Sequence, residues 1–248
     1  MTASWRHTGS QKPRQNRTFR RNRPLQAIAA GYALLWVLAA IEPYNRFDWL
    51  LENVLVFVGV GIILVSYRAA PLSNLSYGLI ALFLAMHIVG SHYTYSLAPP
   101  GFWLGDALDL DRNHYDRVVH FCFGLLLAYP VRETLARAVT LSGYWPAVLV
   151  FALLVAASNL YEMIEWAAAE VISPEAAMAF LGTQGDDFDA QKDTAMAAAG
   201  AIVGLAATAA LQQIHSRRPV PRAKRRPLRW LGVGRIDHGD DRPSRAGR

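Results

Sequence analysis

Six long apolar segments, separated by short polar stretches, constrain this chain more than any other feature of its sequence. A helix that rises 1.5 Å per residue needs about 20 residues to cross the roughly 30 Å hydrocarbon core of a bilayer. All six segments are close to that length, with the first and fourth at the short end. We therefore predict an all-α fold, an integral membrane bundle of six transmembrane helices. The predicted spans are 25–41, 49–67, 75–97, 115–135, 144–170 and 193–214.

Prolines mark the limits of two of these spans. The Pro-Pro-Gly sequence at 99–101 breaks the third span, and we expect an acidic loop to follow it, containing Asp106, Asp109 and Asp111. Pro130 lacks a backbone donor, and its ring clashes with the preceding helical turn. We therefore expect the fourth span to end or kink at this residue.

The positive charge of the chain is concentrated at its two ends. Residues 1–24 hold seven Lys/Arg and no acid, and residues 215–248 hold eleven Lys/Arg and three Asp. Residues 25–214 carry a net negative charge, so the overall charge of +6 comes from the ends and does not indicate nucleic-acid binding. We predict a transmembrane domain over 25–214 between two disordered basic tails that contact anionic lipid headgroups.

The distribution of Lys and Arg predicts the orientation of the bundle. Six spans place both termini on one side, and short cytoplasmic loops are enriched in Lys and Arg. The loops on the side of the tails hold Arg68, Arg132 and Arg137, whereas the basic residues of the opposite loops are outnumbered by acids. Both termini are therefore predicted to be cytoplasmic. With this orientation, every acid of residues 25–214 except Glu133 lies toward the outer side.

Ionisable residues recur at the outer ends of the fourth and fifth spans. Asp116 and His120 are four residues apart, so they share one face of a helix. Glu162 and Glu165 are three residues apart and are neighbours on a face of the next helix. Charged groups at membrane depth are costly, and they usually mark a functional site.

Three aspartates lead into the sixth span. Asp186, Asp189 and Asp193 follow spacings of three and four, which would line one face if the helix begins before Asp186. Farther along, Gly200 and Gly204 form a small-residue stripe that allows close helix packing. The candidate metal ligands are Asp116, His120, Glu162, Glu165, Asp186, Asp189 and Asp193.

Three interpretations of this residue set remain open. A histidine with several carboxylates suits Zn, Mn or Fe, and an all-oxygen subset suits Mg or Ca. Closely spaced carboxylates with a histidine also suit a proton relay or a general acid–base pair. Alternatively, the groups are structural and pair with one another or with Arg117. His87 fits the structural interpretation, and His92 fits either.

Missing motifs argue against several enzyme classes. The chain has no His-Glu-x-x-His helix, no phosphate-binding Gly-Lys-Ser/Thr loop and no Gly-x-Ser-x-Gly elbow. Cys122 is the only cysteine, which excludes an intrachain disulfide and a cysteine-based metal site. An enzyme of this sequence would use metal-activated water on a lipid-linked or envelope substrate. A non-catalytic membrane factor and a small transporter are the alternatives.

Four motifs together resemble one known family. They are HYTY at 92–95, YDRVVHF at 115–121, NLYEMIEW at 159–166, and FLGTQGD at 180–186 followed by Asp189, Gln191 and Asp193. This set resembles the YjdF-like bacterial inner-membrane proteins, a multi-pass group of unknown function. The resemblance covers residues 25–214 and implies a location in the bacterial cytoplasmic (inner) membrane, but it supplies no reaction.

A more distant resemblance is to VanZ-like membrane proteins. In these, an Asp-x3-His sequence opens one helix and acidic residues follow on later helices. This chain shows only part of the VanZ-like pattern, so the resemblance implies no activity for it.

Overall fold

The computed structural model describes residues 18–172, 177 and 180–216, and every regular element in this part of the chain is a helix. Five of the helices are long and apolar enough to cross a membrane. They are α2 (Arg46–Ser66), α3 (Asn74–Tyr93), α5 (Tyr115–Ala138), α6 (Trp145–Ala169) and α8 (Asp189–Ser216). The prediction of an all-α membrane bundle is confirmed at this level. The first predicted span forms α1 (Arg23–Ala39), an apolar helix of 17 residues.

The predicted tails lie mostly outside the described residues. Of the first tail, only its last residues are described; they form η1 (Phe19–Arg21) and the start of α1. Of the second, α8 includes the first two residues. The described helices therefore extend a few residues beyond both ends of the range 25–214.

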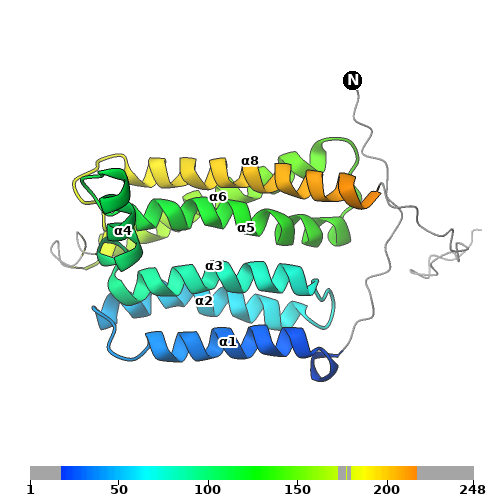
Figure 1. Cartoon of the computed structure of the whole chain (residues 1–248), viewed down its shortest axis with the longest axis horizontal. Helices are drawn as coiled ribbons and strands as arrows, with labels where there is room; N and C mark the ends of the chain where they lie inside the picture. The colour runs from blue at the N-terminus through cyan, green and yellow to red at the C-terminus, as the bar shows by residue number, and fades with distance from the viewer. Residues whose placement is uncertain (1–17, 173–176, 178–179, 217–248) are drawn as a thin grey trace, which may run out of the picture.

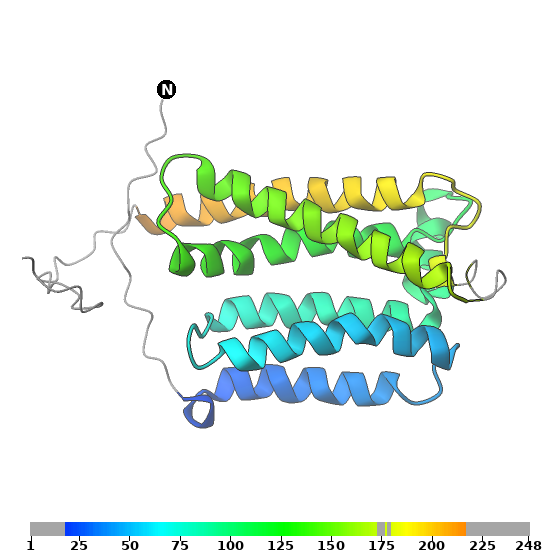
Figure 2. The ribbon, with the colours of Figure 1, turned by 180° about the vertical axis from the view of Figure 1, so that it is seen from behind.

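The long helices run roughly parallel to one axis and form two groups (Figure 1). One group contains α1, α2 and α3, and the other contains α5, α6 and α8. Packing of α3 against α5 joins the two groups. We call the end of the bundle that carries α4 (Pro99–Leu108) the α4 end. The N-terminal ends of α2, α5 and α8 lie there, and so do the C-terminal ends of α3 and α6 (Figure 2).

The closest helix pair is α5 with α8, and small residues make this approach possible. A side chain added at Gly200 would overlap the backbone of Phe121, and one at Gly204 would overlap the backbone of Leu125. Gly124 of α5 meets the backbone of α8 at Ala197 in the same way. The predicted small-residue stripe at Gly200 and Gly204 is therefore confirmed as a packing surface.

The segment after the third span differs from the prediction. α3 ends at Tyr93 rather than at residue 97, because Thr94 adopts a positive φ of 58° before the short η2 (Tyr95–Leu97). The expected acidic loop is confirmed for Asp109 and Asp111, but Asp106 lies in α4, which begins with two prolines. Proline is compatible with the first turn of a helix, since the backbone N–H groups there have no intrahelical acceptor.

The fourth span does not end at Pro130, because α5 continues through this residue to Ala138. The hydroxyl of Thr134 donates a hydrogen bond of 2.9 Å to the Pro130 carbonyl one turn away. At this end of the bundle, opposite the α4 end, Glu133 accepts hydrogen bonds from the backbone N–H and hydroxyl of Ser73 and from the hydroxyl of Ser76. Glu133 therefore holds α5 to the start of α3.

Apolar side chains cover much of the outer surface of the bundle. Such a surface is unusual for a soluble protein but is expected for helices that face lipid. Large apolar side chains of α2 that are about half exposed or more are Leu50, Val54, Phe57, Val58, Ile62, Leu64 and Val65. The other long helices contribute Leu82, Leu153, Leu160, Ile202 and Val203.

Candidate functional site

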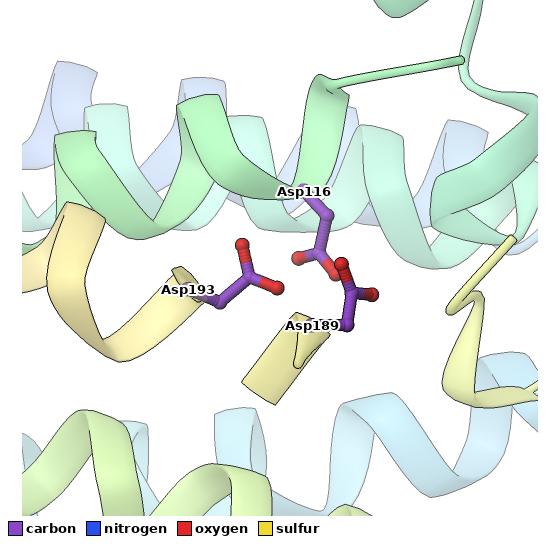
Figure 3. A group of neighbouring side chains, drawn as sticks. All are labelled: Asp116, Asp189 and Asp193. Atoms are coloured by element: carbon purple, nitrogen blue, oxygen red, sulfur yellow. The ribbon is translucent and has the colours of Figure 1, made fainter. Parts of the chain in front are cut away.

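Three aspartates from two helices meet at the α4 end of the bundle (Figure 3). Asp116 lies in the first turn of α5, and Asp189 and Asp193 lie in the first two turns of α8. One carboxylate oxygen of each lies within 4.8 Å of the others. We call this group the carboxylate cluster. It brings together three of the seven predicted ligands at a spacing that suits a shared cation.

Helical periodicity explains why these side chains meet. On α8, Asp189 and Asp193 are followed at steps of four by Ala197 and Ala201, which are fully buried. Residues four apart share a face, so both aspartates lie on the face of α8 that packs against α5. Asp116 is likewise two steps of four before Gly124, which meets the backbone of α8 closely.

Asp193 is the most deeply buried member of the carboxylate cluster. Its relative exposure is 2%, and its Oδ1 atom receives no hydrogen bond from any described residue. Asp189 is also buried, but its Oδ1 contacts Arg112 at 2.9 Å and Arg117 at 3.2 Å. An unpartnered buried carboxylate oxygen is unfavourable. The Asp193 carboxylate as a whole lies beside those of Asp116 and Asp189 (Figure 3).

His120 joins the carboxylate cluster to α6. Its Nε2 atom lies 3.5 Å from Oδ1 of Asp116 and 3.1 Å from Oε1 of Glu162. Its Nδ1 atom lies 3.1 Å from the hydroxyl of Ser158. Three helices thus supply one continuous set of polar groups, which now includes five of the seven predicted residues.

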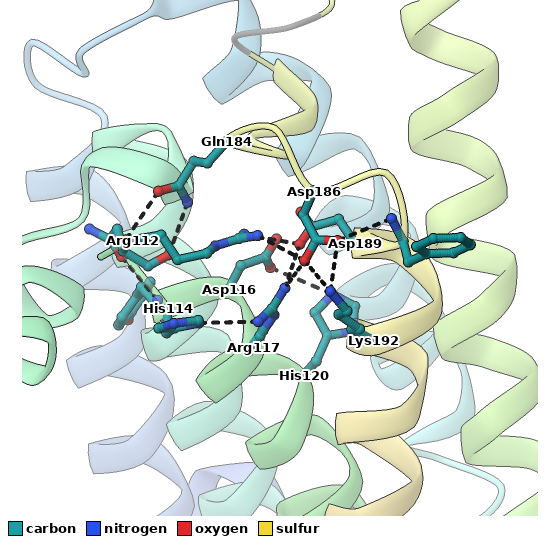
Figure 4. A network of polar contacts seen from close by, with 12 residues as sticks. Arg112, His114, Asp116, Arg117, His120, Gln184, Asp186, Asp189 and Lys192 are labelled. Atoms are coloured by element: carbon teal, nitrogen blue, oxygen red, sulfur yellow. Dashed lines mark hydrogen bonds and ion pairs between the residues drawn. The ribbon is translucent and has the colours of Figure 1, made fainter. Parts of the chain in front are cut away.

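Asp186 occupies a different position from the other aspartates, because α8 begins at Asp189 and not before Asp186. Asp186 lies in the preceding turn, where it contacts Arg117 at 2.5 Å, Lys192 at 2.6 Å and Arg112 at 3.3 Å (Figure 4). Hydrogen bonding by the Lys192 ammonium, supported by the Phe188 N–H and the Arg117 guanidinium, lowers the pKa of Asp186 to about 2. Its carboxylate is therefore neutralised by cationic side chains.

Arg112, just before α5, and Arg117, in its first turn, both pair with aspartates near the start of α8. The structural interpretation offered Asp116 or Glu162 as partners of Arg117, and the structure pairs Arg117 with two other candidate residues, Asp186 and Asp189. His114 lies beside it, with its Nδ1 atom 3.4 Å from Nη1 of Arg117. Burial, followed by the positive charges of Arg117 and Arg112, lowers the pKa of His114. His114 is therefore a neutral neighbour of the arginines at neutral pH.

The loop before α8 is held to the start of α5 by a pair of amide hydrogen bonds. The side chain of Gln184 accepts from the backbone N–H of Asn113 and donates to the Asn113 carbonyl, at 3.0 and 2.9 Å. The Asn113 side chain also donates to the carbonyl of Ala98, before α4. These contacts hold the loop where Asp186 and Asp189 pair with Arg112.

A second polar group, which we call the α2–α3 network, lies beside the site and consists of Glu52, His87, Tyr95 and Tyr161. The Tyr161 hydroxyl of α6 donates to the buried Glu52 carboxylate of α2. His87 Nε2 lies 3.9 Å from that carboxylate, and the hydroxyl of Tyr95 lies 2.5 Å from His87 Nδ1. Glu165 is half-buried on α6, one turn after Glu162.

The sequence comparisons identify the family. Residues 24–214 match the family described as "Predicted membrane protein (DUF2238)". The chain belongs to this family. It is also 38% identical over 179 residues to inner membrane protein YjdF of Escherichia coli (strain K12), an alignment that covers 72% of this chain and 85% of that protein. No solved structure matches the chain.

These findings confirm the predicted resemblance to YjdF-like proteins and the multi-pass inner-membrane location. The DUF2238 match extends across the carboxylate cluster, His120 and the α2–α3 network, so the whole site belongs to the shared domain. Within it, Glu52 is the ionisable residue that sequence reasoning left out. An acid inside an apolar helix is itself a signal of a functional site.

Proposed function

We propose that this DUF2238 protein binds a divalent cation at the carboxylate cluster and acts there on a lipid-linked or envelope substrate. The observation that carries the proposal is the unpartnered Oδ1 atom of Asp193, which is buried beside two further carboxylates. A cation in the space between Asp116, Asp189 and Asp193 would give the Asp193 carboxylate a partner and would offset the mutual repulsion of the three groups.

Electrostatics support a cation at this position. Two like unit charges 4 Å apart repel by about 4 kcal/mol at an effective dielectric constant of 20. The arginines compensate only part of this, since they contact Oδ1 of Asp189 and the carboxylate of Asp186, which lies outside the cluster. Carboxylate oxygens with one nearby imidazole suit Mn²⁺ or Mg²⁺, and also Zn²⁺ or Fe²⁺ when His120 is a ligand.

His120 and Glu162 are then placed for general acid–base catalysis. Nε2 of His120 lies between carboxylates of Asp116 and Glu162, and the Ser158 hydroxyl orients the opposite ring nitrogen. A histidine held by such contacts is suited to accept a proton from a cation-bound water. We propose that His120, supported by Glu162, is the general base of a hydrolytic reaction.

Direct metal measurement tests the site. Purified full-length protein in detergent is expected to bind about one Mn²⁺ per chain, measured by electron paramagnetic resonance of the free ion. Asp193→Asn and Asp116→Asn are expected to weaken binding by tenfold or more. Glu133→Gln, at the opposite end of the bundle, is the matched control and should bind as the wild type does. Equal binding by all four proteins, or binding by none, would overturn the proposal.

The membrane topology is part of the same proposal. We infer that α1 is the sixth span, tilting less than the longer helices, and that both termini are cytoplasmic with their basic tails near anionic headgroups. The carboxylate cluster then faces the outer side. Since Cys122 is the only cysteine, Cys122→Ala provides a background for accessibility labelling.

In that background, Asp106→Cys at the α4 end should react with an impermeant maleimide on intact cells, whereas Val139→Cys at the opposite end should react only after lysis. Both positions are exposed in the structure. The reverse labelling pattern would contradict the orientation while leaving the metal site untouched.

A further inference from the structure

A cavity of about 180 Å³ lies between α2, α3, α5 and α6, next to the carboxylate cluster. Its wall nearest the α4 end is polar and includes His87, Tyr95, His120, Ser158 and Tyr161. The remaining lining side chains are apolar. The cavity therefore has a polar end, which it shares with the candidate site, and an apolar end.

The apolar wall lies deeper in the bundle than the polar wall. Phe83 is four residues from His87 toward the opposite end of α3, which is about 6 Å along the helix. Phe123 is displaced in the same direction from His120 on α5, and both lining residues of α2, Leu55 and Val56, are apolar. On α3 and α5 the lining thus changes from polar to apolar within about one turn, with Val119 as an apolar neighbour of His120. This gradient matches an amphiphile whose polar group lies toward the α4 end.

The side of the cavity between α2 and α6 is the one that faces the bilayer. α2 and α6 lie on the same face of the bundle (Figure 2), yet they are not among its closely packed helix pairs. A hydrogen bond from Tyr161 to Glu52 links them near the α4 end. Farther along, the cavity-lining Leu55 is only half-buried. Lipid chains are the apolar molecules that surround this face of a membrane-embedded bundle.

We propose that this cavity binds a segment of the hydrocarbon chain of a membrane lipid, entering between α2 and α6, and thereby positions the lipid's polar group at His120. A cavity of about 150 Å³ with apolar walls accommodates a benzene-sized molecule, so about 180 Å³ holds a short segment of a chain. The identity of the substrate as a lipid rests on the proposed function, whereas occupation of the cavity by a chain does not.

Photo-crosslinking tests the occupant. The full chain is reconstituted in nanodiscs with a phosphatidylglycerol that carries a diazirine at the middle of one acyl chain, and crosslinked positions are mapped by mass spectrometry. Crosslinks are expected at Val56 and Val119, although both are buried, in addition to exposed positions such as Leu82. Crosslinks confined to exposed side chains would overturn the proposal, because they would show surrounding lipid only.

A pair of variants on one helix sharpens this test. Val56→Phe fills the cavity and is expected to reduce crosslinking at Val119 at least fivefold. Val54→Phe makes the same change two residues away at an exposed position and should leave it unchanged. Leu84→Phe fills the cavity from α3 and replaces Val56→Phe if that protein does not fold. Unchanged crosslinking in the filled cavity would also overturn the proposal.

The two proposals fail separately. Asp193→Asn is expected to lose Mn²⁺ and keep the crosslinks at Val119, and Val56→Phe is expected to keep Mn²⁺ and lose them. A hydrocarbon chain in the cavity without any metal binding would support a lipid-binding protein and contradict the hydrolytic mechanism. Metal binding without a hydrocarbon chain in the cavity would support the metal site and contradict lipid binding.

Discussion

The Nε2 atom of His120 lies 3.1 Å from Oε1 of Glu162, which links the fourth predicted span to the fifth inside the bundle. The same nitrogen lies 3.5 Å from Asp116, one turn earlier on α5. A proton on Nε2 therefore faces two carboxylates, while Nδ1 faces the Ser158 hydroxyl. This arrangement couples the protonation of His120 to the charge state of the carboxylate cluster.

Mn²⁺ affinity is expected to rise with pH. Carboxylate ligands bind a metal in their deprotonated form, so binding displaces protons held by the metal-free carboxylate cluster. Linkage predicts about a tenfold gain in affinity per pH unit for each proton released. Calorimetric titrations between pH 5.5 and 7.5, in two buffers of different ionisation enthalpy, count those protons. Affinity that is independent of pH and of buffer would contradict this prediction.

Asp193→Asn is expected to stabilise the protein when metal is absent. The substitution removes one negative charge from the carboxylate cluster and supplies an N–H₂ donor, where a buried unsatisfied oxygen costs about 1–3 kcal/mol. Thermal unfolding in EDTA should therefore show a higher Tm than the wild type. Added Mn²⁺ should raise the Tm of the wild type but not that of the variant.

Asp187→Asn is the control for this comparison, since Asp187 is exposed and lies outside the cluster. It should behave as the wild type does with and without Mn²⁺. A lower Tm for Asp193→Asn in EDTA would mean that Asp193 stabilises the metal-free bundle and that its carboxylate has a structural role.

Gly200→Ala is expected to destabilise the bundle and weaken Mn²⁺ binding together. The added methyl group would overlap the Phe121 carbonyl, so α5 and α8 must separate. Overpacking of this kind costs about 1–3 kcal/mol. Because Asp193 and Asp116 lie on the same two helices, the separation also moves the carboxylates apart. Thermal unfolding and Mn²⁺ titration measure the two effects.

Gly59→Ala is the matched control, because an added Cβ at Gly59 in α2 meets open space. Replacing a helical glycine by alanine without strain stabilises by up to about 1 kcal/mol. If both variants lose stability equally, the cause is not the contact between α5 and α8.

The contribution of Asp186 to stability is expected to depend on pH in the acid range. Its pKa is lowered in the folded protein from 3.8 to about 2, with the Lys192 hydrogen bond as the largest cause. Its stabilising effect is therefore complete above pH 3.8 and is lost as the pH falls through about 2. The Tm difference between wild type and Asp186→Asn should be constant from pH 7 to 5 and should shrink below pH 4. A constant difference down to pH 2 would rule out this ion pairing.

Tyr161→Phe is expected to destabilise the protein by about 1–3 kcal/mol, because it leaves the buried Glu52 carboxylate without its hydroxyl donor. Tyr44→Phe, at a side chain that is 70% exposed, should be neutral. Thermal unfolding of both variants checks the difference. Mn²⁺ binding should change in neither, since the α2–α3 network lies outside the carboxylate cluster.

Hydropathy and spacing predicted much of the architecture because both are local properties of the chain. The apolar segments were long enough to identify the spanning helices, and Gly200 and Gly204 indicated a close contact. Asp116 with His120 was recognised as one helical face from a spacing of four. The prolines show why position within a helix matters: two begin α4 as part of its first turn, and α5 continues through Pro130 rather than ending there.

The sequence by itself determined that acids and a histidine would gather near one end of the last three spans, since apolar length and helical periodicity place them there. Only the tertiary structure decided which of these side chains join the carboxylate cluster and which pair with cations. Asp189 and Asp193 face α5 because α8 begins at Asp189, whereas Asp186 falls one turn earlier among three cations. Glu52 reaches Tyr161 across 109 residues of sequence. Such pairings depend on where helices start and which faces pack, and no local pattern contains that information.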